Sequence, residues 1–124
     1  MAGVLVAEDD KSLLDFLTMV LRQAGHDVHT ASNGVEALMK YSSYRSSIDV
    51  VVTDVVMPGI NGVELVVRLC ALNPALPILL MTGFVPDDIA LPCDLQVLLK
   101  PFQPGRLLDA IQLAVAAPPA KGSR

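Results

Sequence analysis

The chain has 124 residues, a length that fits one domain large enough to bury a hydrophobic core. Hydrophobic residues make up 52% of it and charged residues 18%, a composition that excludes intrinsic disorder. The net charge of −4 argues against direct binding to nucleic acid, which needs a surplus of Lys and Arg. The apolar runs are too short to cross a membrane and no signal peptide is recognisable, so we expect a cytoplasmic protein without a membrane partner.

Five short segments, four of them mostly apolar and the third rich in β-branched residues, predict five strands. They cover residues 4–7, 26–31, 48–52, 78–81 and 96–99. In the second segment, Val28 is the most core-like position. Amphipathic segments lie between the strands, and this alternation predicts an α/β fold with a doubly wound parallel sheet and helices on both faces.

Capping residues locate the predicted helices. The first helix follows Ser12 as its N-cap, with Asp15 at the third helical position, and ends at Gly25. The other long helices are predicted over residues 35–44, 63–72 and 105–117. We expect a single domain over residues 1–117 and a flexible tail over 118–124, whose last three residues resemble a vector-derived remnant.

The two cysteines are Cys70 and Cys93. They are too few for a disulfide framework, and no C-x-x-C or Cys/His spacing accompanies them that would hold zinc. We therefore predict two buried thiols in a reducing cytosol.

Polar residues with complementary chemistry follow four of the predicted strands. They are Glu8, Asp9 and Asp10 after the first, Asp54 after the third, Thr82 and Gly83 after the fourth, and Lys100 after the fifth. In a doubly wound sheet the ligand crevice lies outside the carboxyl ends of the strands. The four acids carry a formal charge equal to that of the whole chain, so we expect this edge to bind a hard cation such as Mg²⁺.

The same residues fit the transfer of a phosphoryl group. The Thr82 hydroxyl, the Gly83 N–H and the Lys100 ammonium are donors suited to phosphoryl oxygens. Asp54 then remains as the nucleophile, and its attack on phosphorus gives an aspartyl phosphate.

Each of these residues also has a structural interpretation when taken alone. Asp10 suits a helix start, Thr82 a strand-end hydroxyl bonded to its own backbone, Lys100 a solvated charge and Asp54 a turn. The convergence of four strand ends on one chemistry favours a functional site over these separate interpretations.

Four segments, VLVAEDD, TDVVMPGINGVEL, ILLMTGF and VLLKPF, resemble the receiver domain of two-component response regulators across about residues 3–117. The resemblance implies a flavodoxin-like sheet of order 2-1-3-4-5. It implies Mg²⁺ binding by Glu8, Asp9, Asp54 and the backbone carbonyl of Val56, with Asp9 a more direct ligand than Glu8 and Asp10 outside the metal's contacts.

The resemblance also assigns roles in phosphoryl transfer and switching. Asp54 is implied as the phosphoacceptor, Thr82 as the switch hydroxyl and Lys100 as the family's lysine at the phosphoryl group. The bond from Lys100 to Pro101 is implied as a cis peptide.

The chain departs from the family pattern where the switch operates. The usual aromatic residue on the fifth strand is replaced by Val97, and Phe84 is either a substitute for it or a packing residue. Val56 and Phe84 are apolar and offer no side chain to orient water, so we expect slow self-dephosphorylation. The segment between Thr82 and Lys100 is also short for the family, and its prolines predict a short or irregular helix from Pro86 over residues 87–90.

The first predicted helix carries a clue to partners. Phe16 and Met19 lie at the edge of its apolar stripe, where they either dock on the helical bundle that carries a donor histidine or pack under the last helix. His26 and His29 stand on the second strand, and we interpret both as structural or exposed residues.

These observations favour a phosphorylation-controlled signalling switch rather than an enzyme. The expected partners are a histidine kinase or histidine phosphotransfer protein and an unknown downstream protein, and we expect a monomer or weak homodimer. One alternative is a receiver-like scaffold that works without phosphorylation. Another is an aspartyl-phosphate phosphatase of the haloacid-dehalogenase type, which needs a second acid where Val56 stands.

Overall fold

The computed structural model describes residues 2–55, 57, 59–83 and 95–116. In chain order, its elements are β1 (Gly3–Ala7), α1 (Lys11–Gln23), β2 (Asp27–Ala31), α2 (Gly34–Ser43), the 3₁₀ turn η1 (Arg45–Ser47), β3 (Val50–Asp54), α3 (Gly62–Leu72), β4 (Ile78–Thr82), β5 (Leu95–Leu99) and α4 (Pro104–Ala116). No helix in this part of the chain has the length and apolar character needed to cross a bilayer.

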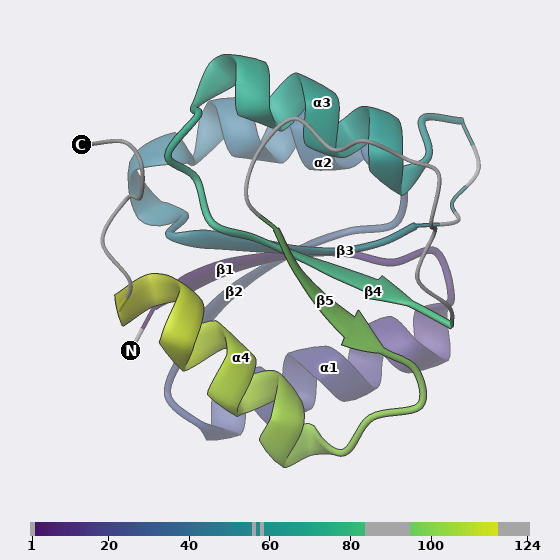
Figure 1. Ribbon diagram of the computed structural model, residues 1–124, viewed down its shortest axis with the longest axis vertical. Helices are drawn as coiled ribbons and strands as arrows, with labels where there is room; N and C mark the ends of the chain where they lie inside the picture. The colour runs from purple at the N-terminus through teal and green to yellow at the C-terminus, as the bar shows by residue number, and fades with distance from the viewer. Residues whose placement is uncertain (1, 56, 58, 84–94, 117–124) are drawn as a thin grey trace.

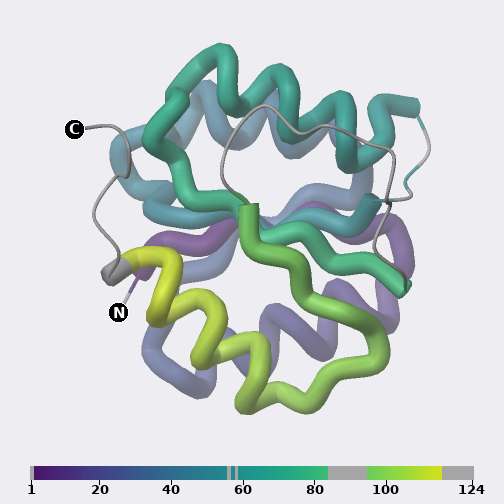
Figure 2. The backbone as a smooth tube through the Cα atoms, viewed as in Figure 1, coloured from purple at the N-terminus to yellow at the C-terminus, as the bar shows by residue number. Residues whose placement is uncertain are grey.

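The five strands form one parallel sheet in the order β2-β1-β3-β4-β5. Helices α2 and α3 cover one face of the sheet and α1 and α4 cover the other (Figure 1). The backbone tube shows the same three layers, with the sheet between the two helix pairs (Figure 2). The predicted α/β fold and its strand order are therefore confirmed. The expected short helix over residues 87–90 and the tail over 118–124 lie outside the described residues.

Two hydrophobic clusters hold the layers together, and alternate side chains of the central strands enter them in turn. Leu5 and Val51 enter the cluster under α2 and α3. Val4 and Val50 enter the cluster under α1 and α4. Because both faces are covered, β1 is buried along its whole length, as are residues 50–53 of β3.

Helix α1 begins earlier than predicted, and Ser12 is not its N-cap. Asp10 is the N-cap: its Oδ1 accepts hydrogen bonds from the backbone N–H groups of Ser12 (3.0 Å) and Leu13 (3.3 Å). Aspartate is as good a cap as serine, so Asp10 can start the helix two residues before Ser12. Asp15 therefore lies one turn inside α1, where it pairs with Lys11 at 3.3 Å. The predicted stop at Gly25 holds, since Gly25 adopts φ +95° just beyond the C-cap.

Two further expectations are wrong. Val28 is only half-buried and packs at the margin of the cluster under α1 and α4, whereas Ala31 is the buried residue of β2. The strand is at the edge of the sheet, so it has a neighbouring strand on one side only. Cys70 is not a free thiol: it is disulfide-bonded, and Cys93 lies outside the described residues. Two cysteines are too few for several disulfide bonds, but whether a cysteine forms a single disulfide bond depends on distances in the fold, which the sequence does not give.

Candidate functional site

Strand register brings the predicted polar residues together at the carboxyl ends of the parallel strands, which form one edge of the sheet. Ala7 of β1 pairs with Thr53, so Glu8 follows at the level of Asp54. Thr82 of β4 pairs with Leu99, and Lys100 follows one residue later. All strands run in the same direction, so their carboxyl ends share this edge (Figure 1). Glu8, the residue after β1, and Asp54, the last residue of β3, therefore lie beside one another, and Lys100 follows β5 to reach both.

Three carboxylates form the centre of the site. One carboxylate oxygen from each of Glu8, Asp9 and Asp54 lies within 4.8 Å of the others. Asp9 is exposed, Asp54 is half-buried, and Glu8 is only 1% exposed. The backbone N–H of Asp10 donates to Glu8 Oε2 at 3.1 Å and fixes that side chain. Oxygen ligands in this arrangement suit Mg²⁺, so the residues present fit the ion that the sequence implies.

Lys100 joins two of these acids. Its Nζ donates to Asp54 Oδ2 at 3.0 Å and to Glu8 Oε1 at 3.4 Å. The lysine backbone is fixed as well, because its N–H donates to the carbonyl of Thr82 at 2.7 Å. The bond from Lys100 to Pro101, for which the family resemblance implies a cis peptide, is cis.

Burial and charge shift the protonation of this cluster. The pKa of Glu8 is raised from 4.5 to about 7, chiefly by burial and also by the nearby charge of Asp54, against the hydrogen bond from Asp10 and the charge of Lys100. Burial acts to lower the pKa of Lys100, but its hydrogen bond to Asp54 and the charges of Glu8 and Asp54 outweigh burial and raise it. The ammonium is therefore charged at neutral pH, whereas Glu8 is divided between its two forms.

Thr82 and Gly83 complete the edge. Thr82 is the last residue of β4 and is buried, and Gly83 follows it in an exposed position. The structure thus brings Thr82, Lys100 and the three carboxylates to one edge. Val56 and Phe84, for which the sequence suggests a metal ligand and a switch residue, lie outside the described residues.

Other predicted residues lie away from this cluster. Asp10 uses its carboxylate to cap α1, which supports its structural interpretation. Val97 is 39% exposed on the edge strand β5. His26 Nδ1 accepts the N–H of Ala2 at 3.0 Å, and His29 stacks on Tyr44 at 4.7 Å, so both histidines have structural partners.

Two residues that the sequence reasoning missed contact the backbone at Asp54. The Thr53 hydroxyl is buried and donates to the carbonyl of Asp54 at 3.0 Å. The N–H of Gly62 donates to the carbonyl of Val55 at 2.7 Å. A hydroxyl in an otherwise apolar strand was the available signal for Thr53. Gly62 was hidden in an Asn-Gly pair that predicts a turn in many proteins.

Comparison with known proteins gives a consistent result. The family model for the response regulator receiver domain matches residues 4–112. The response regulator receiver protein CpdR of Brucella abortus is 36% identical over 122 residues, which cover 94% of this chain and 99% of CpdR. A receiver domain from Clostridium thermocellum superposes with a TM-score of 0.85 at 29% identity, over 93% of this chain and 94% of that one. The chemotaxis protein CheY4 of Vibrio cholerae has a TM-score of 0.81 and 35% identity, over 92% and 98%. The chain belongs to the response regulator receiver family.

Proposed function

We propose that this protein is a phosphorylation-controlled switch that accepts a phosphoryl group on Asp54. The observation that carries the proposal is the contact of Lys100 Nζ with both Asp54 and Glu8, beside a third carboxylate on Asp9. A lysine ammonium that is hydrogen-bonded to two carboxylates, beside a half-buried aspartate, is suited to neutralise the negative charge of a phosphoryl group. We assign the domain to residues 1–117 and the tail to residues 118–124.

The reaction follows from these positions. A carboxylate oxygen of Asp54 attacks phosphorus, an O–P bond forms, and the P–N bond to the donor imidazole breaks as that group leaves. Bound Mg²⁺, held by Asp9, Asp54 and Glu8, would supply the positive charge that lets a phosphoryl anion approach three acids. Lys100 stands within reach of an oxygen on Asp54, and the Thr82 hydroxyl and Gly83 N–H are the further donors that we assign to the phosphoryl oxygens.

The partners in this proposal are proteins. The donor is a histidine kinase or a histidine phosphotransfer protein, and output passes by contact to a downstream protein rather than through nucleic acid. Phe16 and Met19 are 40% and 49% exposed on α1, which favours docking over packing for that helix. We place the protein in the cytoplasm as a monomer or weak homodimer.

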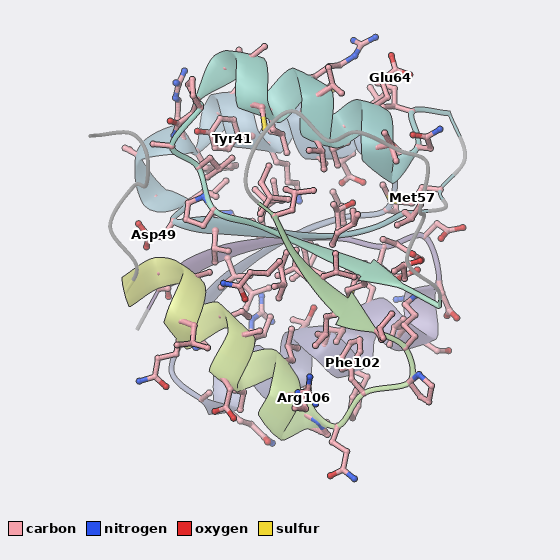
Figure 3. The ribbon with its side chains drawn as sticks, in the orientation of Figure 1. Tyr41, Asp49, Met57, Glu64, Phe102 and Arg106 are labelled. Atoms are coloured by element: carbon pink, nitrogen blue, oxygen red, sulfur yellow. The ribbon has the colours of Figure 1, made fainter. Side chains whose placement is uncertain are left out.

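Intact mass measurement with acetyl phosphate and Mg²⁺ tests the proposal. We expect one added phosphoryl group, about 80 Da, that is lost with hydroxylamine and absent without Mg²⁺ or in Asp54→Asn. Asp49→Asn is the matched control, because Asp49 binds the Gly3 N–H at the opposite edge of the sheet and the amide oxygen can keep that bond. Figure 3 labels Asp49 at the opposite end of the sheet from Met57, which follows β3.

The alternatives give different results in this measurement. A protein that binds Mg²⁺ but gains no mass would be a receiver-like scaffold that works without phosphorylation. A phosphatase would release phosphate from many monoesters with repeated turnover, and such turnover in the wild type would contradict the assignment as a switch.

A further inference from the structure

Helix α3 starts directly against the end of β3. Gly62 is its first residue, and the N–H of Gly62 donates to the carbonyl of Val55 at 2.7 Å. The preceding residue, Asn61, caps the helix by accepting the N–H of Glu64 at 2.9 Å. The first turn of α3 is therefore hydrogen-bonded to the backbone of Val55, the residue that follows Asp54.

Gly62 has no room for a side chain. A Cβ at this position would overlap the carbonyl oxygen of Asp54 and lie 2.7 Å from the Cα of Val55. Both are backbone atoms, so they cannot rotate away as the end of a flexible side chain would. Among the described glycines, positive φ angles occur at Gly25 and Gly59, so an unusual backbone angle does not explain the glycine at 62. Alanine would be the better helix former, and close approach is what the position requires.

The carbonyl group of Asp54 is held from a second direction. The Thr53 hydroxyl, fully buried, donates to the Asp54 oxygen at 3.0 Å. Val55 also donates its N–H to the carbonyl of Met81 on β4 at 3.1 Å. The peptide groups that carry the Asp54 side chain are thus fixed by β4, by Thr53 and by the start of α3.

We propose that Gly62 is a positioning residue for the Asp54 carboxylate. The inference rests on the proposed function, since it concerns the same acid. A side chain at 62 would push the Asp54–Val55 peptide away from α3, and the carboxylate would move relative to Lys100 Nζ, now 3.0 Å away, and to the other two acids. Displacement of a reacting group by about 1 Å can lower a rate about 100-fold.

Gly62→Ala and Gly3→Ala together test this proposal. A Cβ on Gly3 would overlap the carbonyl of Ser47 just as closely, but Gly3 begins β1 at the opposite edge of the sheet. We expect both variants to lose stability in urea unfolding. The measurements that separate them are Mn²⁺ affinity, from the electron paramagnetic resonance signal of free Mn²⁺, and the rate of phosphorylation by acetyl phosphate per folded molecule.

The proposal expects Gly62→Ala to weaken Mn²⁺ binding about tenfold or more and to slow phosphorylation by about 10- to 100-fold. Gly3→Ala should keep the wild-type values of both. Wild-type metal affinity and rate in folded Gly62→Ala would overturn the positioning role. Failure of the wild type to accept phosphate would instead refute the proposed function, while the Mn²⁺ comparison would still decide the role of Gly62.

A measurement on the wild type covers the case in which Gly62→Ala does not fold. In ¹⁵N-labelled protein titrated with Mg²⁺, the amide resonance of Gly62 should shift with that of Asp54. The amides of Gly3 and of Gly105, which is exposed on α4, should not move. If Mg²⁺ shifts the amide resonance of Asp54 but not that of Gly62, the two positions are not coupled and the proposal is refuted.

Discussion

Replacing Glu8 by Gln should make the metal-free protein more stable at neutral and alkaline pH. Glu8 is 1% exposed, and its pKa rises from 4.5 to about 7, first because burial removes water from the carboxylate and then because Asp54 is near. The folded state therefore holds this proton more tightly than the unfolded chain does. The stabilisation is complete below about pH 4.5 and is lost as the pH rises through about 7.

The size of the effect follows from the pKa shift. Each pKa unit corresponds to about 1.4 kcal/mol, so ionised Glu8 lowers the free energy of unfolding by about 3 kcal/mol above pH 7. Gln keeps the shape and carries no charge, and its single amide oxygen can replace the carboxylate oxygen that accepts from the Asp10 N–H, although it loses the second oxygen, which accepts from Lys100. Lys100 retains its bond to Asp54. We expect Glu8→Gln to gain up to about 3 kcal/mol at about pH 8 and almost nothing at about pH 4.

Urea unfolding followed by circular dichroism, with a chelator present and across that pH range, measures this gain. Glu36→Gln is the control, because the N–H and hydroxyl of Ser32 lower the pKa of Glu36 at the surface. That variant should lose some stability above about pH 5 instead of gaining it. If the free energy of unfolding of the wild type and of Glu8→Gln depends on pH in the same way, the argument that burial raises the pKa of Glu8 is refuted. Added Mg²⁺ should stabilise the wild type more than Glu8→Gln, because only the wild type keeps all three carboxylates.

Three further substitutions test separate contacts. Asp10→Ala should lower stability by about 1 kcal/mol through loss of the α1 cap, with Mg²⁺ affinity unchanged in a calorimetric titration; weaker metal binding would place Asp10 in the metal site. Tyr41→Phe should cost about 1 kcal/mol in urea unfolding, because Asn73 donates to the Tyr41 hydroxyl at 3.1 Å between α2 and α3; an unchanged midpoint would show that this bond adds no net stability. Phe16→Ala should slow phosphotransfer from a phosphohistidine protein but not from acetyl phosphate, and equal slowing of both would contradict docking through α1.

The edge of the sheet that carries the site could be predicted from sequence because buried parallel strands are easy to recognise. Continuous apolar runs such as residues 4–7 and 50–52 end abruptly at charged residues, and parallel strands end on one side. Asp54 and Lys100, 46 residues apart, could be expected near each other on that argument alone. Their 3.0 Å contact could not, because it depends on the side-chain conformations and on the cis bond after Lys100.

Prediction from local sequence failed where two neighbouring residues suited the same role, or where distant parts of the fold decide the role of a residue. Asp10 and Ser12 are both good N-caps, and the choice depends on how soon after β1 the chain can turn. Val28 looks like a core residue, but an edge strand has a neighbour on one side only. Gly62 reads as part of a turn, and its actual constraint is the backbone of a strand eight residues earlier.

The charge balance of the site explains why so costly an arrangement can persist in a small domain. Glu8, Asp9 and Asp54 bring three negative charges together, and Lys100 compensates one of them, which leaves two when all three acids are ionised. One divalent cation would balance that remainder. Without it, burial and the nearby charge of Asp54 raise the pKa of Glu8, and the proton that Glu8 keeps relieves part of the repulsion. A cation that binds the three carboxylates must displace this proton, so metal affinity should increase as the pH rises through about 7. Burial of the apolar residues of β1 and β3 stabilises the fold and compensates the cost of placing these charges at the strand ends.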